Sequence, residues 1–372
     1  MRLTLLALLV LGAPAANAQG TLSTQGFGYP PGQLSARAAA MGGGIAETDP
    51  FSPLNPAALA DWGRPGFYIQ YSPEYRSVSS PGHEDNTMTA RFPVLGGALT
   101  IGQRAVIGVS SSTLLDRTWQ TQRTGVDPTS GSGVQFTESF RSDGAINDTR
   151  VALSVNIAHG LWIGVGGHAF SGDNQLRITR TSADTTSANF DQKSKLSYAG
   201  SGASAGIVWQ PASHLTLAVS GRLGGRITSY RNDTTLTHAD VPKRLGGGAT
   251  FSLPGLVVSA RADWEGWSSL APLGTPGLGV VDAWDYGVGA EVAGPTFLGA
   301  ALPLRVGYRH RTLPFTVDGT EVRENTFSVG VGVPISRGRS RIDLGFQRAN
   351  RGTIEGISEH AWTFNAGFMV RP

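Results

Sequence analysis

The sequence predicts an all-β protein, namely a transmembrane antiparallel β-barrel of about fourteen strands with an N-terminal plug segment. Apolar residues recur with a period of two from Gly66 to the end of the chain. This period is typical of strands with one apolar face. The opposite face of most of these strands carries charged residues or glycine. A short apolar stretch near the N-terminus also indicates export from the cytoplasm.

Composition excludes several classes of function. Of the 372 residues, 15% are charged and 51 are glycine, and the formal net charge is +3. So small a charge excludes electrostatic capture of nucleic acid as the main activity. The chain has no cysteine, which excludes disulfides, zinc–thiolate sites, cysteine nucleophiles and lipoprotein acylation. We therefore expect no cofactor, no bound metal and no nucleic-acid partner.

The N-terminus has the features of a secretory signal peptide. Arg2 supplies a positive charge, residues 3–12 are apolar, and Ala16-Asn17-Ala18 forms a small-x-small cleavage site. The apolar stretch is shorter than the about 20 residues that a spanning helix requires. We therefore expect a protein of the bacterial outer membrane. The expected domains are a signal peptide at 1–18, a plug or hatch at 19–65 and a barrel at 66–372.

Alternation along the later strands has two physical explanations. In residues 284–292 and 362–370, aromatic and aliphatic side chains alternate with polar, charged or glycine residues. A soluble β-sandwich turns the apolar face inward, whereas a transmembrane barrel turns it to the lipid. The charged, glycine-rich second face favours the barrel, as do aromatic residues near strand ends, which are typical of interfacial girdles. These aromatic residues are Trp264, Trp267, Trp284, Tyr308 and Trp362.

About fourteen segments follow this pattern, and bacterial single-chain barrels have an even number of strands. The expected strands are 66–78, 85–101, 105–122, 133–157, 161–180, 190–209, 214–230, 241–253, 255–267, 282–293, 302–312, 325–335, 338–348 and 361–370. Short turns alternate with longer polar loops, which is the usual asymmetry between the two rims of such a barrel. The expected long loops are 123–132, 181–189, 231–240, 268–281 and 313–324.

Residues 19–65 lack the period of two and contain a helix-like run at 35–41. They include the pattern Ser-x-Arg-x-x-x-Met-Gly, a short acidic stretch, and Asn-Pro-Ala shortly before the first strand. These motifs resemble the N-terminal plug of the FadL/TodX-type outer-membrane transporters of hydrophobic compounds. The residues that carry the plug motif are Arg37, Met41, Gly42, Asn55 and Pro56. Residues 351–359 resemble PorV-like relatives in the same superfamily.

The resemblance implies a plugged barrel that takes up hydrophobic compounds, such as long-chain fatty acids, by passive diffusion. In that family the ligand leaves sideways through a gap made by a kink in the third strand. Here the third strand, 105–122, contains no proline, whereas the second contains Pro93 and two glycines. Proline cannot donate to the ladder and glycine weakens it. The expected lateral exit consists of Phe92, Pro93, Gly96 and Gly97; a simple bend in the strand explains the same residues.

Catalytic and metal-binding chemistry have little support in the sequence. His83 stands beside Glu84 and Asp85, but three adjacent residues of an extended chain cannot all point at one ion. An outer-membrane hydrolase needs a serine–histidine pair on adjacent strands. The nearest local pair, His168 and Ser171, has no third group to orient it. We therefore expect a protein that is not an enzyme.

Charged residues of both signs lie on the expected inner face of the late strands, for example Arg261, Asp263, Arg305 and Asp343. They either form a network that stiffens the lumen or guide a carboxylate head group. Our main hypothesis is a channel whose partners are hydrophobic small molecules or lipids, within the outer-membrane lipid. The alternative is a PorV-like barrel that docks other envelope proteins, for example in protein secretion. An apolar pocket beneath the outer loops would separate the two hypotheses.

Overall fold

The computed structural model describes most of the chain after the predicted signal peptide, which lies outside the described residues. These are residues 22, 24–80, 83–126, 134–182, 189–274, 277–297, 300–335, 339–354 and 356–371. The strands are β1 (Gly66–Ser80), β2 (His83–Arg91), β3 (Val94–Ile101), β4 (Ala105–Asp116), β5 (Trp119–Val126), β6 (Gln135–Ala158), β7 (Leu161–Ser182), β8 (Phe190–Ala212), β9 (Leu215–Arg231), β10 (Thr234–Asp240), β11 (Arg244–Leu253), β12 (Leu256–Glu265), β13 (Ala283–Phe297), β14 (Ala300–Val317), β15 (Thr320–Ile335), β16 (Ser340–Ile354) and β17 (Ile357–Val370). Among the helices of this part of the chain, none has the length and apolar character needed to cross a bilayer.

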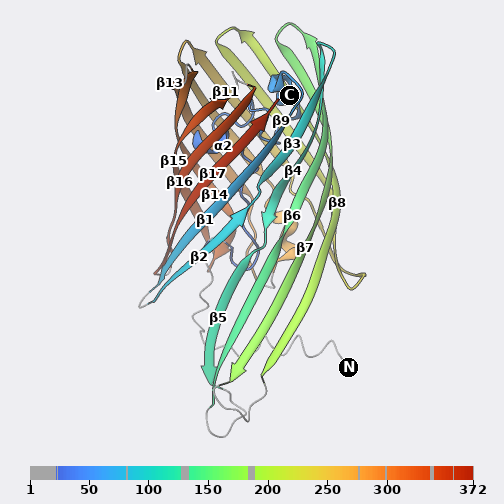
Figure 1. Ribbon diagram of the computed structural model, residues 1–372. Coiled ribbons are helices and arrows are strands. Elements are labelled where there is room, and N and C mark those ends of the chain that lie inside the picture. Colours follow the sequence, from blue (N-terminus) through green and yellow to red (C-terminus); the bar gives the residue numbers. More distant parts are fainter. Residues whose placement is uncertain are drawn as a thin grey trace.

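The strands form one antiparallel sheet that closes on itself (Figure 1). Closure occurs because β1 pairs with β17 along one edge and with β2 and β3 along the other. Three strands of the wall are each divided into two parts, namely β2 with β3, β4 with β5, and β10 with β11. Each divided strand pairs along its length with one continuous neighbour, which is β1, β6 or β9. The wall is therefore a closed barrel of 14 strands, as predicted.

The outer face of the wall is apolar and the inner face is polar. Across β14 to β17, the exposed side chains of Val306, Val329, Phe346 and Phe364 lie opposite one another in a single row. A soluble sandwich would bury such a row, whereas a membrane barrel presents it to lipid. The inner face holds buried arginine, aspartate and glutamate side chains instead. The arrangement therefore excludes the sandwich explanation.

Aromatic residues near strand ends have two different positions. Trp284 and Trp362 are exposed on the outer face, as expected of an interfacial girdle. Trp267 is buried, so its predicted place in the girdle is wrong. It begins the short 3₁₀-helix η2 (Trp267–Leu273), whose buried residues also include Leu270. The predicted loop 268–281 therefore begins with a helix that packs inside the barrel.

Two other predicted loops are wrong because the hairpins extend further than the apolar pattern. Residues 234–240 form β10, and residues 313–324 continue β14 and β15 around a turn at Asp318 and Gly319. Beyond the lipid-facing belt the side chains of a strand need not be apolar, so the period of two disappears while the backbone pairing continues. The predicted loops 123–132 and 181–189 lie partly outside the described residues.

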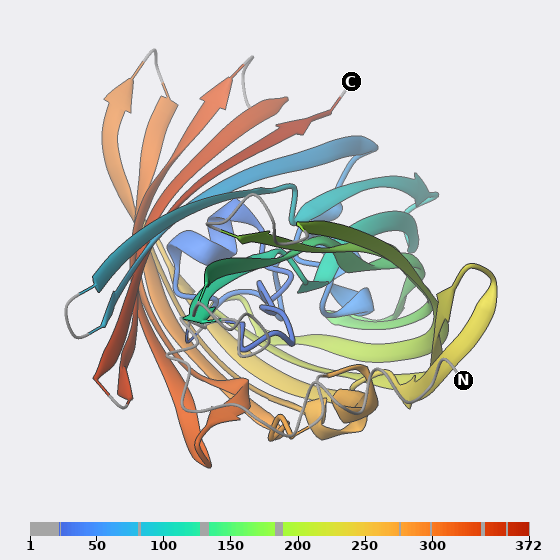
Figure 2. The same ribbon diagram turned by 90° about the horizontal axis from the view of Figure 1, so that it is seen from below.

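Residues 24–62 run inside the ring of strands, as the blue segment of Figure 2 shows. The segment contains the helix α2 (Ala36–Ala40), where a helix-like run is predicted, and the 3₁₀-helix η1 (Pro56–Trp62). Asn55 begins η1 because its side chain accepts a hydrogen bond of 2.9 Å from the backbone N–H of Ala57. Pro56 occupies the first position of η1, where its missing N–H costs nothing.

Candidate functional site

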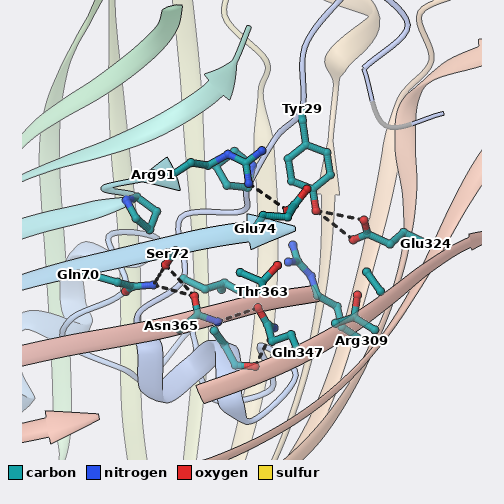
Figure 3. A pocket seen from close by; sticks show the side chains of 16 residues that line it. Tyr29, Gln70, Ser72, Glu74, Arg91, Arg309, Glu324, Gln347, Thr363 and Asn365 are labelled. Atoms are coloured by element: carbon teal, nitrogen blue, oxygen red, sulfur yellow. Dashed lines mark hydrogen bonds and ion pairs between the residues drawn. The ribbon is translucent and has the colours of Figure 1, made fainter. Parts of the chain in front are cut away.

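A cluster of charged side chains surrounds Tyr29 of the N-terminal segment (Figure 3). Four guanidinium groups lie 4.7 to 5.8 Å from the centre of its ring, those of Arg76, Arg91, Arg311 and Arg351. The Tyr29 hydroxyl donates a hydrogen bond of 3.0 Å to Glu324, to which Arg351 also donates at 2.7 Å. Four buried carboxylates balance the arginines, those of Glu74, Asp116, Glu324 and Glu359. The cluster therefore ties the segment to the wall without net charge.

The cavity beside Tyr29 is polar. It has a volume of about 50 Å³, and a chain of hydrogen bonds joins several of its side chains. Ser72 donates to Asn365 at 2.7 Å, and Asn365 donates to Gln347 at 3.0 Å (Figure 3). A polar cavity of this size suits ordered water rather than an apolar ligand. This cavity is therefore not the apolar pocket that the transport hypothesis requires.

Replacing Arg351 with leucine is expected to lower the free energy of unfolding by about 3–5 kcal/mol, because Glu324 and Glu359 would each lose one of two arginine partners and the cluster would keep an uncompensated buried negative charge. The midpoint of denaturant unfolding in detergent measures this loss. As a control, replacing the exposed Arg323, whose ion pair with Glu321 is 3.7 Å long, should change the free energy by less than about 0.5 kcal/mol. Equal midpoints for the two variants would contradict the assigned role of Arg351.

A second ion-pair cluster holds the acidic stretch of the segment. Arg244 of β11 donates to both Glu47 and Asp263, and the Ser220 hydroxyl donates to Glu47 at 2.8 Å. Burial by itself raises the pKa of the Glu47 carboxyl, but Arg244 and Ser220 more than offset this, so its pKa lies below its ordinary value. Glu47 is therefore ionised at neutral pH and links the segment to β9 and β11.

The predicted plug residues lie within the segment or against the wall. Arg37 forms an ion pair of 2.8 Å with Glu291 of β13, and Met41 is fully buried. Gly42 has a φ of +60°, and a Cβ there would lie 2.5 Å from the backbone nitrogen of Tyr308. Only glycine suits such a left-handed residue in close contact with a strand. The backbone of the segment at Gly42 therefore packs directly against the backbone of β14.

The wall is interrupted between β2 and β4. The interruption begins at Phe92 and Pro93, which lie between the end of β2 and the start of β3. The Pro93 carbonyl accepts a hydrogen bond of 3.2 Å from the backbone N–H of Thr113. Before Pro93 in the sequence, β2 pairs with β1 and with no other described strand. A cavity of about 460 Å³ occupies the interruption, whose two sides diverge in Figure 1. Gly96 and Gly97 stay within the ladder, paired with β4.

Side chains close the interruption from within the lumen. Arg91 of β2 forms an ion pair with Asp116 of β4 across the opening. The backbone of Asp116 also exchanges hydrogen bonds of 2.7 and 2.9 Å with the backbone of Tyr29. The N-terminal segment thus satisfies part of the free edge of β4, as backbone at membrane depth requires.

Arg150 on β6 is a buried cation without a partner. Its side chain points into the lumen and the residue is 3% exposed, yet its Nε and Nη1 atoms have no hydrogen-bond partner in the described chain. It lies directly opposite Ser110 of β4, whose hydroxyl also has no partner. Both line a small cavity of about 10 Å³, together with apolar side chains that include Phe51, Leu59 and Val94. Free donors beside an apolar surface suit the head group of an amphipathic anion.

An apolar compartment occupies the half of the lumen that faces the long hairpins. Its wall residues include Leu115, Ile146, Phe170, Ile227, Leu270, Leu313 and Phe315. Two side chains of the N-terminal segment, Leu22 and Phe27, are inserted into it and are fully buried. The Phe27 ring meets the Trp267 ring edge to face, with centroids 6.5 Å apart. An apolar volume beneath the hairpins therefore exists, and the chain fills it with its own side chains.

His168 does not pair with Ser171, the nearest serine in the sequence. Ser171 is exposed on the outer face of β7, whereas His168 is buried and faces the lumen. Instead, His168 forms hydrogen bonds with Asp148 of β6 and Ser204 of β8. In the described residues, no group of three side chains is arranged to hold a metal ion.

The closed barrel, its apolar outer belt and its charged, partly filled lumen define an integral membrane β-barrel of the bacterial outer membrane, as predicted. Its particular fold is that of the FadL- and TodX-type barrels. It is similar to a Pseudomonas aeruginosa FadL homologue (TM-score 0.62, 14% identity, 92% of this chain and 99% of that one). It is also similar to the Ralstonia pickettii toluene transporter TbuX (0.59, 15%, 91% and 98%) and the P. putida toluene transporter TodX (0.55, 14%, 92% and 99%).

The resemblance predicted from the N-terminal motifs is therefore confirmed at the level of the fold. The family model called BamG matches residues 301–370, which cover most of β14 to β17. No curated protein matches the chain. The PorV-like resemblance of residues 351–359 stays a prediction.

Sequence reasoning missed Arg150 as a candidate ligand contact. Its place in the period-two pattern of β6 predicts an inward side chain, next to the outward Val151. The pattern does not show which groups lie around a side chain. Arg117 also has no carboxylate partner, but it donates to Tyr198 and Leu273, whereas the Nε and Nη1 atoms of Arg150 have no partner in the described residues. Residue spacing along one strand carries no information about that.

Proposed function

We propose that this protein is an outer-membrane channel for the passive uptake of hydrophobic compounds, and that its N-terminal segment is the plug. The apolar compartment around Phe27 supports this proposal, because burial of apolar surface is worth about 25 cal/mol per Å². A ligand that displaces Leu22 and Phe27 would exchange one set of apolar contacts for another. The toluene transporters with the same fold are named for cargo of this kind.

Arg150 is the observation that carries the more specific part of the proposal. A buried guanidinium without a counter-ion is costly, and a ligand carboxylate would remove that cost. The adjoining cavity, of about 10 Å³, holds at most one water, so Phe51 and Leu59 of the plug must withdraw before a ligand enters. The cargo is therefore a long-chain carboxylate, with its head at Arg150 and Ser110 and its chain along the apolar side.

Equilibrium binding to the purified protein tests this assignment. A long-chain carboxylate should bind more tightly than the alcohol of the same chain length, because only the carboxylate pairs with the free Arg150 donors. Equal affinity for the two compounds would refute the role of Arg150, although a channel for neutral hydrocarbons would still be compatible with the apolar compartment.

The interruption at Phe92 and Pro93 is the proposed lateral exit. Replacing Pro93 with valine restores a backbone N–H and the freedom to extend, so β2 and β3 can join into one continuous strand. We expect slower uptake of a hydrophobic substrate into proteoliposomes, with an unchanged unfolding midpoint. Pro303 is the matched control, because it lies in β14 where the ladder is paired with β13. Normal uptake by the Pro93→Val protein would place the exit elsewhere.

A second candidate function is docking of other envelope proteins, including a PorV-like role in secretion. The observation in its favour is the match of residues 301–370 to the BamG family model, since that family is linked to outer-membrane biogenesis. Crosslinking from outward positions of β14 to β17 in cells tests it. A specific protein adduct there, together with no carboxylate binding by the purified barrel, would favour docking over transport.

A further inference from the structure

Three side chains from adjacent strands form a linear hydrogen-bonded array in the lumen. The Asp148 carboxylate of β6 lies 2.7 Å from His168 Nδ1 of β7, and His168 Nε2 lies 2.8 Å from Ser204 Oγ of β8. All three residues are buried, with exposed fractions of 2%, 7% and 7%. A carboxylate, an imidazole and a hydroxyl in this order and at these distances have the geometry of a nucleophile, its general base and the group that orients the base.

Asp148 and His168 are both held in place by further contacts. The second oxygen of Asp148 accepts a hydrogen bond of 3.2 Å from Gln33 of the N-terminal segment and lies 3.6 Å from Arg222 Nη1. The His168 ring stacks on Phe170, with the two planes 8° apart. The carboxylate is therefore directed at Nδ1, which leaves Nε2 to accept the proton of the Ser204 hydroxyl.

The side chain of Arg150 and the hydroxyl of Ser204 lie over the same glycine of β7. Arg150 lies directly opposite His168 in the β6–β7 ladder. A Cβ on Gly166 would lie 2.7 Å from Ser204 Oγ and 3.4 Å from Arg150 Cδ, so both side chains lie over this glycine. Because Gly166 has no side chain, the Ser204 hydroxyl and the methylene carbons of Arg150 both come close to its backbone. A carbonyl group between them would have a nucleophile on one side and unpaired N–H donors near its oxygen.

We propose that Ser204, His168 and Asp148 form an acyl-transfer site that hydrolyses carboxylic esters of long-chain acids inside the barrel. The inference rests on the proposed function only for the route by which the ester enters the lumen. Arg150, the proposed anchor of a carboxylate head, is here the donor to the ester carbonyl. The lumen would therefore process an ester and hold the resulting acid at one position.

The reaction needs only the ester and water. Ser204 Oγ attacks the carbonyl carbon while its proton passes to His168 Nε2, and the negative charge on the carbonyl oxygen is stabilised by the N–H groups of Arg150. The C–O bond to the alcohol then breaks, and His168 returns its proton to the leaving oxygen. Water repeats the sequence on the acyl-serine, releasing the carboxylic acid and restoring the hydroxyl. Asp148 positions His168 and contacts no substrate.

A small serine-directed fluorophosphonate tests the site in the full-length protein in detergent, with mass spectrometry to locate the adduct. We expect one adduct, on Ser204, and turnover of a chromogenic long-chain ester. Both should fall to the blank level in Ser204→Ala and His168→Ala. Ser154 is the matched control, since its hydroxyl is buried on the same inner face but bonds to the Ala57 carbonyl instead of a histidine. The Ser154→Ala protein should react normally.

Asp148→Asn separates positioning from a purely structural role. If Asp148 orients the imidazole, the variant should react about 10³- to 10⁴-fold more slowly, and its pH profile should differ from that of the wild type. Absence of any Ser204 adduct in the wild type, or an unchanged rate in His168→Ala, would overturn the proposal. Carboxylate binding measured on the same samples distinguishes the transport proposal from the hydrolase proposal. Normal carboxylate binding together with an unreactive Ser204 would refute only the hydrolase proposal.

Discussion

Replacing Arg150 with leucine should weaken binding of a long-chain carboxylate by roughly 10- to 100-fold, because a net 1.5–3 kcal/mol of charge-assisted hydrogen bonding disappears. Binding of the alcohol of the same chain length should change little, since it makes no ion pair. Isothermal calorimetry or competition with a fluorescent fatty acid measures both affinities. Lysine at this position keeps the charge without the forked donors, so its affinity should lie between those of arginine and leucine.

The stability of the same variant provides its control. Removing the Arg150 side chain leaves no carboxylate unpaired, so Arg150→Leu should unfold at the wild-type midpoint or above it. Arg351→Leu should unfold earlier, because Arg351 pairs with Glu324 and Glu359. A loss of stability in Arg150→Leu as large as that in Arg351→Leu would show that Arg150 has a structural partner. Unchanged carboxylate binding would show that the ligand head lies elsewhere.

Deleting residues 19–60 should convert the barrel from a closed into an open channel. Residues 24–62 run inside the ring of strands, and the inner wall that a deletion would leave behind is charged and will hydrate, as the lumen of a porin does. Liposomes that contain the deleted protein should swell in small sugars at a porin-like rate. Those that contain the full chain should swell at nearly the rate of protein-free liposomes.

Folding of the deleted protein must be checked before its permeability is interpreted. Apart from the bridge between Tyr29 and Asp116, the described strands of the wall pair with one another, so the heat-modifiable gel shift of a folded barrel should persist. The Glu47→Gln protein is a useful intermediate, because it removes one charge that links the segment to Arg244 and should open the lumen only in part. Equal swelling with and without residues 19–60 would show that the segment is not a plug.

Much of the fold could be predicted because the period of two is a local property. In residues 362–370, for instance, each side chain points to the face opposite its neighbour, whatever the rest of the chain does. The same argument fails for the parts of the strands that extend beyond the lipid-facing belt, because their outward side chains need not be apolar. Residues 234–240 and 313–324 are therefore strands that the pattern cannot reveal. Trp267 is of a residue type typical of the interfacial girdle, but its side chain is buried in the core.

The candidate site depends on register, which the sequence does not specify. Arg150 faces Ser110 across one ladder and His168 across the next, and these residues are separated by hairpins of different length. Shifting one strand by two residues would keep every side chain on its face and change every neighbour. Ser171 lies three residues from His168 and therefore on the opposite face of β7, whereas the contact of His168 with Ser204 depends on the register of β7 and β8.

The sequence by itself determined the closed antiparallel barrel, its apolar exterior and the separate N-terminal segment, since each of these follows from side-chain alternation and local motifs. Only the tertiary structure decided which lumen charges are neutralised. Arg244 forms ion pairs with Glu47 and Asp263, and Arg351 forms them with Glu324 and Glu359. Arg150 forms no ion pair with a carboxylate in the described residues. The physical reason is that an ion pair forms between side chains brought within bonding distance. In a closed barrel that distance is set by strand register, and by the path of the segment through the lumen.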